Sequence, residues 1–519
     1  MTNLPPMSST GFLRWVWRQL TSMKTALVLL FLLAVASVPG SVYPQRGVDP
    51  IKVRDFITKS PTWGPILDRL GFFEVYSSPW FSAVYLLLFL SLIGCVIPRV
   101  GVHFRAMRSA PPAVPRMLER LAGSREVTPT ASAEEVIGAV AGALRKARWR
   151  VVSGPADSPT WVAAEKGYLR ETGNLVFHVS LLFVLSAIAI GGLFGWKGNV
   201  IVREGSGFSN TVTQYDAWGG GRYTNAQDIP PFSFTLDKFT VDFERGIAQR
   251  GAPRAFEAEM SYKVDPTAPV ERRLVEVNEP LSISGAKVFL VGHGYAPLIT
   301  VTDKTGKVVF DDAVPFLPQD GSFTSTGVVK ILDSTPQLGI QALFLPTAAL
   351  DDVLGPHSTF PGPDDPALFM SAWKGDLGLN TGKPQSVYRL VTDKMTKIGL
   401  EQLRPGTSWK LPDGSGTVTF SGYKRWASFQ IAYDPGKEIA LIFVALAIVG
   451  LTMSLFIRRR RVWVKVVERD GVTVIQLAGI MRASTFEDKD IGALAEDLDF
   501  VEQALQVAGV ARGIEKEQS

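Results

Sequence analysis

Four long apolar runs constrain the fold of this chain more than any other feature of its sequence. They occupy residues 21–43, 80–97, 174–196 and 439–457. A helix rises about 1.5 Å per residue, so about 20 apolar residues cross the roughly 30 Å hydrocarbon layer of a membrane. The mean hydropathy of +0.15 over 519 residues agrees with such runs. We therefore predict a polytopic α-helical membrane protein with four transmembrane helices.

The distribution of Lys and Arg around these runs predicts the orientation of the chain. Residues 98–173 carry twelve Lys and Arg against seven Asp and Glu, and residues 458–461 read RRRR. Because basic flanks resist translocation, we expect both termini and the 98–173 loop in the cytoplasm. The 242 residues from 197 to 438 should then lie outside the plasma membrane. The basic residues gather beside the runs, so the pI near 9.1 indicates membrane topology and no nucleic-acid binding.

The segments between the runs predict the remaining organisation. The outer segment alternates apolar and polar residues, as in 232–243 and 256–264, with Gly, Pro, Asn and Asp between such stretches. This pattern predicts a large β-rich domain, for which a two-layer β-sandwich is the expected arrangement. The expected order is 1–20 cytoplasmic N-terminus, 21–43 helix, 44–79 short outer loop, 80–97 helix, 98–173 cytoplasmic loop, 174–196 helix, 197–438 outer β-rich domain, 439–457 helix and 458–519 cytoplasmic hairpin and helix.

The cytoplasmic segments predict two small α+β pieces, each too small to bury much surface alone. In the first, Ser132 and Glu135 have the spacing of a capping box at the start of a helix. In the second, Asp470-Gly471 is a strong signal for a hairpin turn. Strands are expected at 149–152, 160–164, 462–467 and 472–477, and a C-terminal helix is indicated by the apolar series Ile491, Leu494, Leu498, Val501, Leu505 and Ala508. We predict that the two pieces pack together.

Some chemistry is made improbable by what the sequence lacks. It contains no GxSxG, Walker A, HExxH or CxxC pattern in a credible context, so we expect a non-catalytic subunit and not an enzyme acting alone. Cys95 is the single cysteine, so any thiol redox step must belong to a partner; its own expected role is that of a small buried hydrophobe. Residues 34–36 (AVA) also fit a signal-peptidase site, which would remove the first run and leave the later topology unchanged.

His178 is the one ionisable side chain in the third run. Ionisable residues in spanning helices usually mark function, because burying them without a partner costs several kcal/mol. The residue lies about five positions inside the run, roughly 7 Å below the cytoplasmic interface. Asn174 lies one turn earlier, able to orient a group or bond the ring, and Leu181, Leu182 and Leu185 would form an apolar wall. A polar mouth over an apolar slot suits haem, and imidazole is a common axial ligand of its iron. The alternative is a core histidine bonded to a carbonyl or to another helix.

The other three histidines carry weaker signals. His103 follows the second run, and we expect it to be interfacial. His293, in VGHGYAP, and His357, in a Pro- and Gly-containing loop, should be surface or turn residues of the outer domain, with a transient ligand role as the alternative. A proton relay would require further acids or histidines within the runs, and the sequence has none there.

Several segments, in order, resemble the ResB-like cytochrome c biogenesis proteins of the System II pathway. The similarity extends over most of the chain and is most specific at residues 166–182, which read KGYLRETGNLVFHVSLL. The other similar segments are 37–46 (SVPGSVYPQR), 77–99 (SSPWFSAVYLLLFLSLIGCVIPR), 433–451 (YDPGKEIALIFVALAIVGL), 458–466 (RRRRVWVKV) and, in the outer domain, 280–297 (PLSISGAKVFLVGHGYAP).

The resemblance implies a subunit of a membrane complex for cytochrome c maturation. Such a subunit works with a ResC- or CcsA-type membrane protein, whose histidines and tryptophan-rich segment complete a haem channel and ligation site. It helps carry non-covalent b-type haem across the membrane, keeps it reduced and presents it to apocytochrome c. A thioredoxin-like thiol reductant would act indirectly.

The resemblance also implies a role for His178. This residue matches the family's histidine in the third span, so we expect it to be an axial haem ligand, with Asn174 in support and the second ligand supplied by the partner. The alternative function is a haem-free scaffold or chaperone that holds apocytochrome c for a partner ligase.

Overall fold

A computed structural model describes residues 8–48, 50–121, 123–155, 160–379, 387–469, 472–482 and 488–512. The chain forms two compact units. The first, called the helical unit here, comprises Met1–Tyr43, Pro61–Ala189 and Gly436–Ser519. The second, called the β unit, comprises Pro44–Ser60 and Ile190–Pro435. Each unit is described by itself below.

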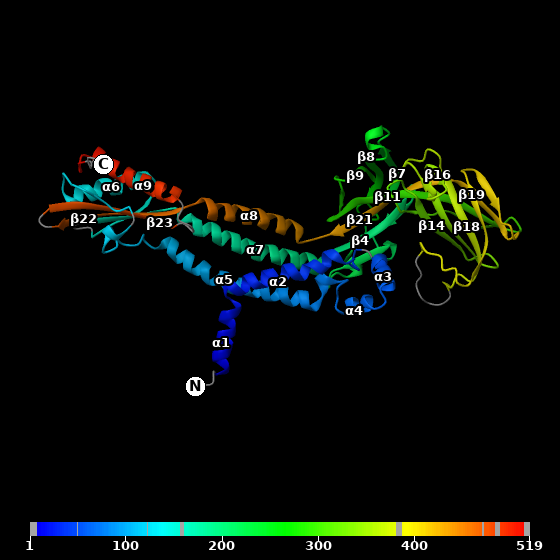
Figure 1. The fold of residues 1–519 in the computed structure, drawn as a ribbon, viewed down its shortest axis with the longest axis horizontal. Helices are drawn as coiled ribbons and strands as arrows, with labels where there is room; N and C mark the ends of the chain where they lie inside the picture. The colour runs from blue at the N-terminus through cyan, green and yellow to red at the C-terminus, as the bar shows by residue number, and fades with distance from the viewer. Residues whose placement is uncertain are drawn as a thin grey trace. The chain divides into compact units, whose positions relative to one another are not determined.

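The predicted set of four long apolar helices is confirmed (Figure 1). They are α2 (Met23–Val42), α5 (Pro79–Arg108), α7 (Leu169–Phe194) and α8 (Lys437–Phe456). Helix α5 continues well beyond the second apolar run, with Pro98 inside it. Three shorter helices are α1 (Ser9–Leu20), α3 (Pro50–Lys59) and α4 (Trp63–Arg69).

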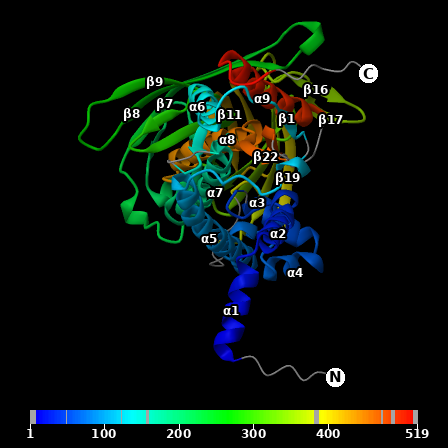
Figure 2. The same cartoon turned by 90° about the vertical axis from the view of Figure 1, so that its left-hand side faces the viewer.

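Polar contacts connect α5 to both of its neighbours. The hydroxyl of Ser91 and the thiol of Cys95 donate to the carbonyls of Leu20 and Thr21, each at 2.6 Å, at the turn that precedes α2. Cys95 is therefore a half-buried hydrogen-bond donor as well as a small apolar side chain. On α7, the carbonyl of Leu185 accepts a bond from the Tyr85 hydroxyl. Figure 2, which looks along the bundle, shows α5 and α7 next to each other.

Helices α7 and α8 cross at two glycines. A Cβ on Gly173 would lie 2.7 Å from the carbonyl oxygen of Gly450, and a Cβ on Gly450 would lie 2.6 Å from the backbone nitrogen of Phe177. Nearer the other end, the rings of Phe183 and Phe443 stack with centroids 4.2 Å apart. Small residues at a crossing let two backbones approach closely, which favours helix association in an apolar medium.

The two small α+β pieces pack together as predicted. They form one antiparallel sheet in the order β1-β23-β22-β3-β2, with α6 and α9 contributing to the same apolar core. The capping box of Ser132 and Glu135 is present. The Asp470-Gly471 turn lies outside the described residues, as does the side chain of Ile491. The elements are β1 (Arg125–Val127), α6 (Ala133–Lys146), β2 (Arg150–Ser153), β3 (Trp161–Lys166), β22 (Arg459–Arg469), β23 (Val472–Arg482) and α9 (Asp488–Val507).

The β unit is β-rich, as predicted, and its described strands form four antiparallel sheets. The largest contains β4 (Trp196–Arg203), β6 (Ala217–Gly220), β10 (Leu281–Ile283), β11 (Ala286–Asp303), β12 (Val308–Ala313), β20 (Thr407–Lys410) and β21 (Gly416–Tyr433). A second contains β5 (Gly207–Ser209), β7 (Ser233–Phe243), β8 (Pro253–Lys263) and β9 (Glu271–Glu276). A third contains β13 (Leu317–Pro318), β14 (Ser325–Ile331), β15 (Leu338–Leu345), β18 (Ala367–Gly375) and β19 (Met395–Leu403), and β16 (Ala348–Asp351) pairs with β17 (Gly355–Ser358).

Two apolar cores of the β unit share the long strands β11 and β21. One half of this strand pair packs against the β5-β7-β8-β9 sheet through residues such as Val288 and Phe429. The other half packs against the β13-β14-β15-β18-β19 sheet through residues such as Ile299 and Phe420. The structure thus has two packed cores on a continuous pair of strands, where the sequence suggested one two-layer sandwich.

Candidate functional site

A cavity of about 990 Å³ lies among α2, α5 and α7 in the helical unit. Most of its lining is aliphatic, and its polar lining is concentrated on α5 and α7 and at the start of β22. The volume is at the upper end of the range of about 300–1,000 Å³ that is typical of cofactor and ligand pockets. Both residues that the sequence suggested for haem binding, His178 and Asn174, line this cavity.

His178 lines the cavity and is held through one of its ring nitrogens. Its Nδ1 lies 2.7 Å from the carbonyl oxygen of Asn174, one turn earlier on α7. Because a carbonyl only accepts, this contact places the proton on Nδ1 and leaves a lone pair on Nε2 in the neutral ring. The structure records no hydrogen bond to Nε2 from any described residue. The adjacent Phe177 ring contacts the imidazole edge to face, with centroids 5.1 Å apart. A fixed ring with a free Nε2 is the arrangement that metal-binding histidines show.

The surroundings of His178 match the sequence expectation in part. Leu181 and Leu185 line the cavity, whereas Leu182 is not among its lining residues. The carbonyl of Leu182 accepts a bond from Ser186 within α7. Asn174 contacts the imidazole through its backbone carbonyl and lines the cavity.

His103 lines the same cavity, which the sequence did not suggest. It lies on the part of α5 that extends past the apolar run, and its Nε2 is 3.0 Å from the hydroxyl of Thr172 on α7. Its Nδ1 is buried without a hydrogen-bond partner and is 4.0 Å from a carboxylate oxygen of Glu171. The side chain is only 15% exposed and forms a contact between α5 and α7.

Charged side chains collect at the His103 end of the cavity. Arg99, Arg170, Glu171 and Arg459 all line it. Arg459 donates to both Glu165 and Glu171, so β3, β22 and the start of α7 are joined by one ion-pair network. Thr172 precedes His178 by six residues, which corresponds to about 9 Å along α7. The cavity is therefore charged at one end and apolar around the imidazole.

His293 of the β unit was expected in a turn or at the surface, and this prediction was wrong. The residue lies within β11, among four phenylalanine rings whose centroids are 4.6 to 6.2 Å from its own; they belong to Phe239, Phe243, Phe256 and Phe323. Gly292 and Gly294 flank His293, and glycines in this position are typical of a turn. Gly294 makes room for Trp426 instead, because a Cβ there would lie 2.4 Å from the indole ring. Burial, and then the charge of Arg425, lowers the pKa of His293 to about 4.

His357 agrees with the expectation of a turn residue. It lies on β17, and its Nδ1 is 3.0 Å from the carbonyl oxygen of Gly355, at the tight connection to β16. Gly355 has a φ of +70°, a conformation that glycine adopts without steric cost. Among the residues that the structure describes, no three His, Cys, Asp or Glu side chains are grouped so that they could hold a metal ion.

Comparison with known proteins places the chain in a family. The profile of the ResB-like family matches residues 23–489. A cytochrome c biogenesis protein CcsB from Gloeobacter violaceus is 25% identical over 472 residues, covering 87% of this chain and 84% of the relative. Proteins of the same name from Thermosynechococcus vestitus and from a Synechococcus species are 26% and 28% identical over 297 and 298 residues, each covering 56% of this chain and 63% of the relative. The chain is a membrane protein that belongs to the ResB-like family.

Proposed function

We propose that this chain takes part in cytochrome c maturation by binding haem in the cavity among α2, α5 and α7. The cavity itself carries the proposal, because it combines room for a cofactor, an imidazole with a free Nε2 and a charged end. The relatives named cytochrome c biogenesis proteins support the wider role. In this proposal the b-type haem is non-covalent and in transit.

The polarity of the cavity fits the two chemical parts of haem. The aliphatic lining around His178, including Leu181 and Leu185, suits the porphyrin, and Nε2 of His178 suits its iron. At the other end, Arg99 and Arg170 offer guanidinium groups to the propionates, and His103 offers a ring nitrogen. Guanidinium groups form strong, directional bonds to carboxylates.

The second axial ligand would come from outside this chain. His103 uses its Nε2 in the contact with the Thr172 hydroxyl, whereas His178 keeps its Nε2 free of described partners. We therefore propose a ResC- or CcsA-type membrane protein as the partner that completes the site. Apocytochrome c would receive the haem, and a thioredoxin-like reductant would act on its thiols.

The test is the haem content of the purified two-protein complex. His178→Ala should reduce bound haem at least about tenfold, equivalent to 1.4 kcal/mol, and should lower covalent cytochrome c by a similar factor. Added imidazole should restore part of both signals by occupying the vacated ligand position. Absorbance in the Soret region, per mole of complex, measures the first effect, and haem staining of cytochrome c measures the second.

His357→Ala is the matched control, because it removes a histidine that lies in the β unit and outside the cavity. It should leave haem content unchanged. A colourless wild-type complex that still matures cytochrome c would contradict haem binding and favour the scaffold function, in which the chain holds apocytochrome c for the partner. Equal haem in wild type and His178→Ala would contradict the proposed ligand.

A further inference from the structure

A second cavity in the helical unit is distinct from the one around His178. It has a volume of about 550 Å³ and lies where α8 leads into β22 and β3 leads into α7. Four basic side chains line it, namely Arg148, Lys166, Arg458 and Arg460. Among the described residues, the lining of this pocket and the lining of the cavity around His178 have no residue in common.

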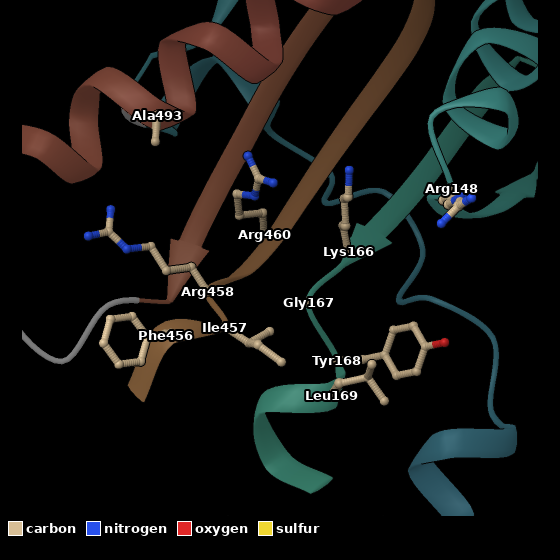
Figure 3. A pocket seen from close by; sticks show the side chains of 10 residues that line it. All are labelled: Arg148, Lys166, Gly167, Tyr168, Leu169, Phe456, Ile457, Arg458, Arg460 and Ala493. Carbon is tan, nitrogen blue, oxygen red and sulfur yellow. The ribbon is translucent and has the colours of Figure 1, made fainter. Parts of the chain in front are cut away.

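Figure 3 shows that the lining separates into two parts. Lys166 and Arg460 lie side by side on one side of Gly167, with Arg458 and Arg148 flanking them. The apolar side chains lie on the other side of Gly167; they are Leu169, Phe456 and Ile457. A pocket with this division suits a ligand that has an anionic head and an apolar body.

The position of Gly167 explains why the two helix ends meet here. Its φ is +80°, and a Cβ would lie 1.9 Å from the carbonyl oxygen of Arg458. Only glycine combines this conformation with so close an approach. The contact holds the start of α7 beside the end of α8, so that the side chains from both connections line one pocket.

Two of the basic side chains of the pocket, Arg460 and Lys166, interact with groups outside its lining. Asp497 on α9 pairs with Arg460 at 2.8 Å and also interacts with Lys166. Lys166 donates to the carbonyl of Ala147 at 3.2 Å. Arg148 is exposed, and no carboxylate is among the described residues that line the pocket. An anion in the pocket would therefore face four basic side chains.

The apolar part of the lining belongs to helices that are long and apolar enough to cross a membrane. Phe456, the last residue of α8, is 80% exposed, and Leu169, the first residue of α7, is 41% exposed. Side chains at this level of a membrane helix meet the boundary between lipid headgroups and acyl chains. Basic pockets between membrane helices are suited to anionic lipid headgroups.

We propose that this pocket binds an anionic phospholipid, with the headgroup phosphate among Arg148, Lys166, Arg458 and Arg460 and the first part of an acyl chain against Phe456 and Leu169. The bound lipid would join the α7 and α8 ends to the sheet of β3 and β22. This proposal does not depend on haem binding and can be tested on the haem-free protein.

The experiment measures lipid binding to the detergent-solubilised full-length chain by native mass spectrometry. The probes are phosphatidylglycerol, phosphatidylcholine and glycerol 3-phosphate, each titrated separately. Phosphatidylglycerol should bind at least about tenfold more tightly than either of the others. Equal binding of phosphatidylcholine would overturn the requirement for an anion, and equal binding of glycerol 3-phosphate would overturn the lipid in favour of a simple phosphate site.

Variants of the pocket's arginines test whether phosphatidylglycerol binds in this pocket. Arg148→Gln with Arg458→Gln should weaken phosphatidylglycerol binding at least about tenfold, because it removes two of the four basic groups proposed to bind the phosphate. Arg148→Gln alone changes only an exposed side chain and should weaken binding at least threefold. Arg145→Gln is the matched control, since Arg145 is also exposed, is three residues away and does not line the pocket. Unchanged binding in both test variants, or an equal loss in the control, would contradict the proposal.

Discussion

His178 and His293 both lie among apolar side chains, yet their surroundings differ in kind. His178 borders a cavity of about 990 Å³ and keeps Nε2 free of described partners. His293 is surrounded by the rings of four phenylalanines, the nearest being Phe323 at 4.6 Å between centroids. One imidazole has space beside it, and the other has packed rings.

An apolar environment alone therefore does not make a histidine a ligand. A ligand position needs a free nitrogen, room for the bound group and charge where that group is charged. The cavity of the helical unit provides all three through His178, its volume and the charged end at Arg99 and Arg170. In the β unit, the rings of four phenylalanines pack around the imidazole of His293 instead.

The largest expected effect comes from replacing each histidine by phenylalanine. His178→Phe should lower the haem content of the two-protein complex at least about tenfold, or 1.4 kcal/mol, because the ring keeps its volume and loses the nitrogen. His293→Phe should leave haem content within twofold of wild type. Absorbance per mole of complex measures both. A haem loss in His293→Phe equal to that in His178→Phe would show that the two imidazoles do not differ in haem binding.

The next effect tests whether the cavity wall depends on the close crossing of α7 and α8. Gly450→Ala places a Cβ 2.6 Å from the backbone nitrogen of Phe177, next to His178. We expect a loss of about 1–3 kcal/mol in stability, typical of overpacking, together with lower haem content. Gly101→Ala on α5 is the control, because a Cβ there meets nothing within 4 Å. Thermal unfolding in detergent measures stability, and equal midpoints for both variants would show that the crossing is not tight.

The ring cluster predicts a sensitivity to acid. The pKa of His293 falls from 6.5 to about 4 in the folded chain, first through burial and then through the charge of Arg425. Between pH 6.5 and about pH 4, His293 is protonated in the unfolded chain but not in the folded chain. Its contribution to the free energy of unfolding is therefore complete above pH 6.5 and is lost as the pH falls toward 4. The loss at pH 5 should be about 2 kcal/mol.

The measurement compares wild type and His293→Phe. The thermal midpoint of wild type should fall between pH 7.5 and pH 5 by more than that of the variant, which has no titrating ring at this position. His357→Phe should behave like wild type, since His357 lies outside the ring cluster. Parallel pH profiles for wild type and His293→Phe would show that this ring does not titrate between folded and unfolded states.

Part of this comparison was accessible from the sequence. The four apolar helices follow from composition, and His178 stood out as the one ionisable side chain in the third run. The packing of the two α+β pieces followed from their exposed apolar faces, as the shared core of Val136 and Val501 shows. These features depend on local pattern, which a single sequence contains.

The remainder depends on contacts between distant residues. His103 contacts Thr172, which is 69 positions later in the sequence, and the residues next to His103 do not predict this contact. A signal was nevertheless present, because Leu92, Cys95, Arg99 and His103 recur at three- and four-residue steps and all line the cavity. His293 was misjudged because its flanking glycines look like a turn, whereas Gly294 accommodates Trp426 from a strand more than 130 residues away.

The smallest expected effect concerns the contact between His103 and Thr172. Thr172→Val keeps the shape of the side chain and removes the hydroxyl that lies 3.0 Å from Nε2 of His103. A hydrogen bond of this kind contributes about 0.5–1.5 kcal/mol, so the thermal midpoint should fall only slightly. Haem affinity should fall by less than tenfold, because His103 loses its fixed orientation at the charged end while His178 is unchanged. Thr452→Val is the matched control, since the hydroxyl of Thr452 donates within α8, to the carbonyl of Ile448. If Thr172→Val removed haem as completely as His178→Phe, the charged end of the cavity would be the main determinant of haem binding, and not the imidazole of His178. The distinction between His178 and His293 would then depend on charge alone.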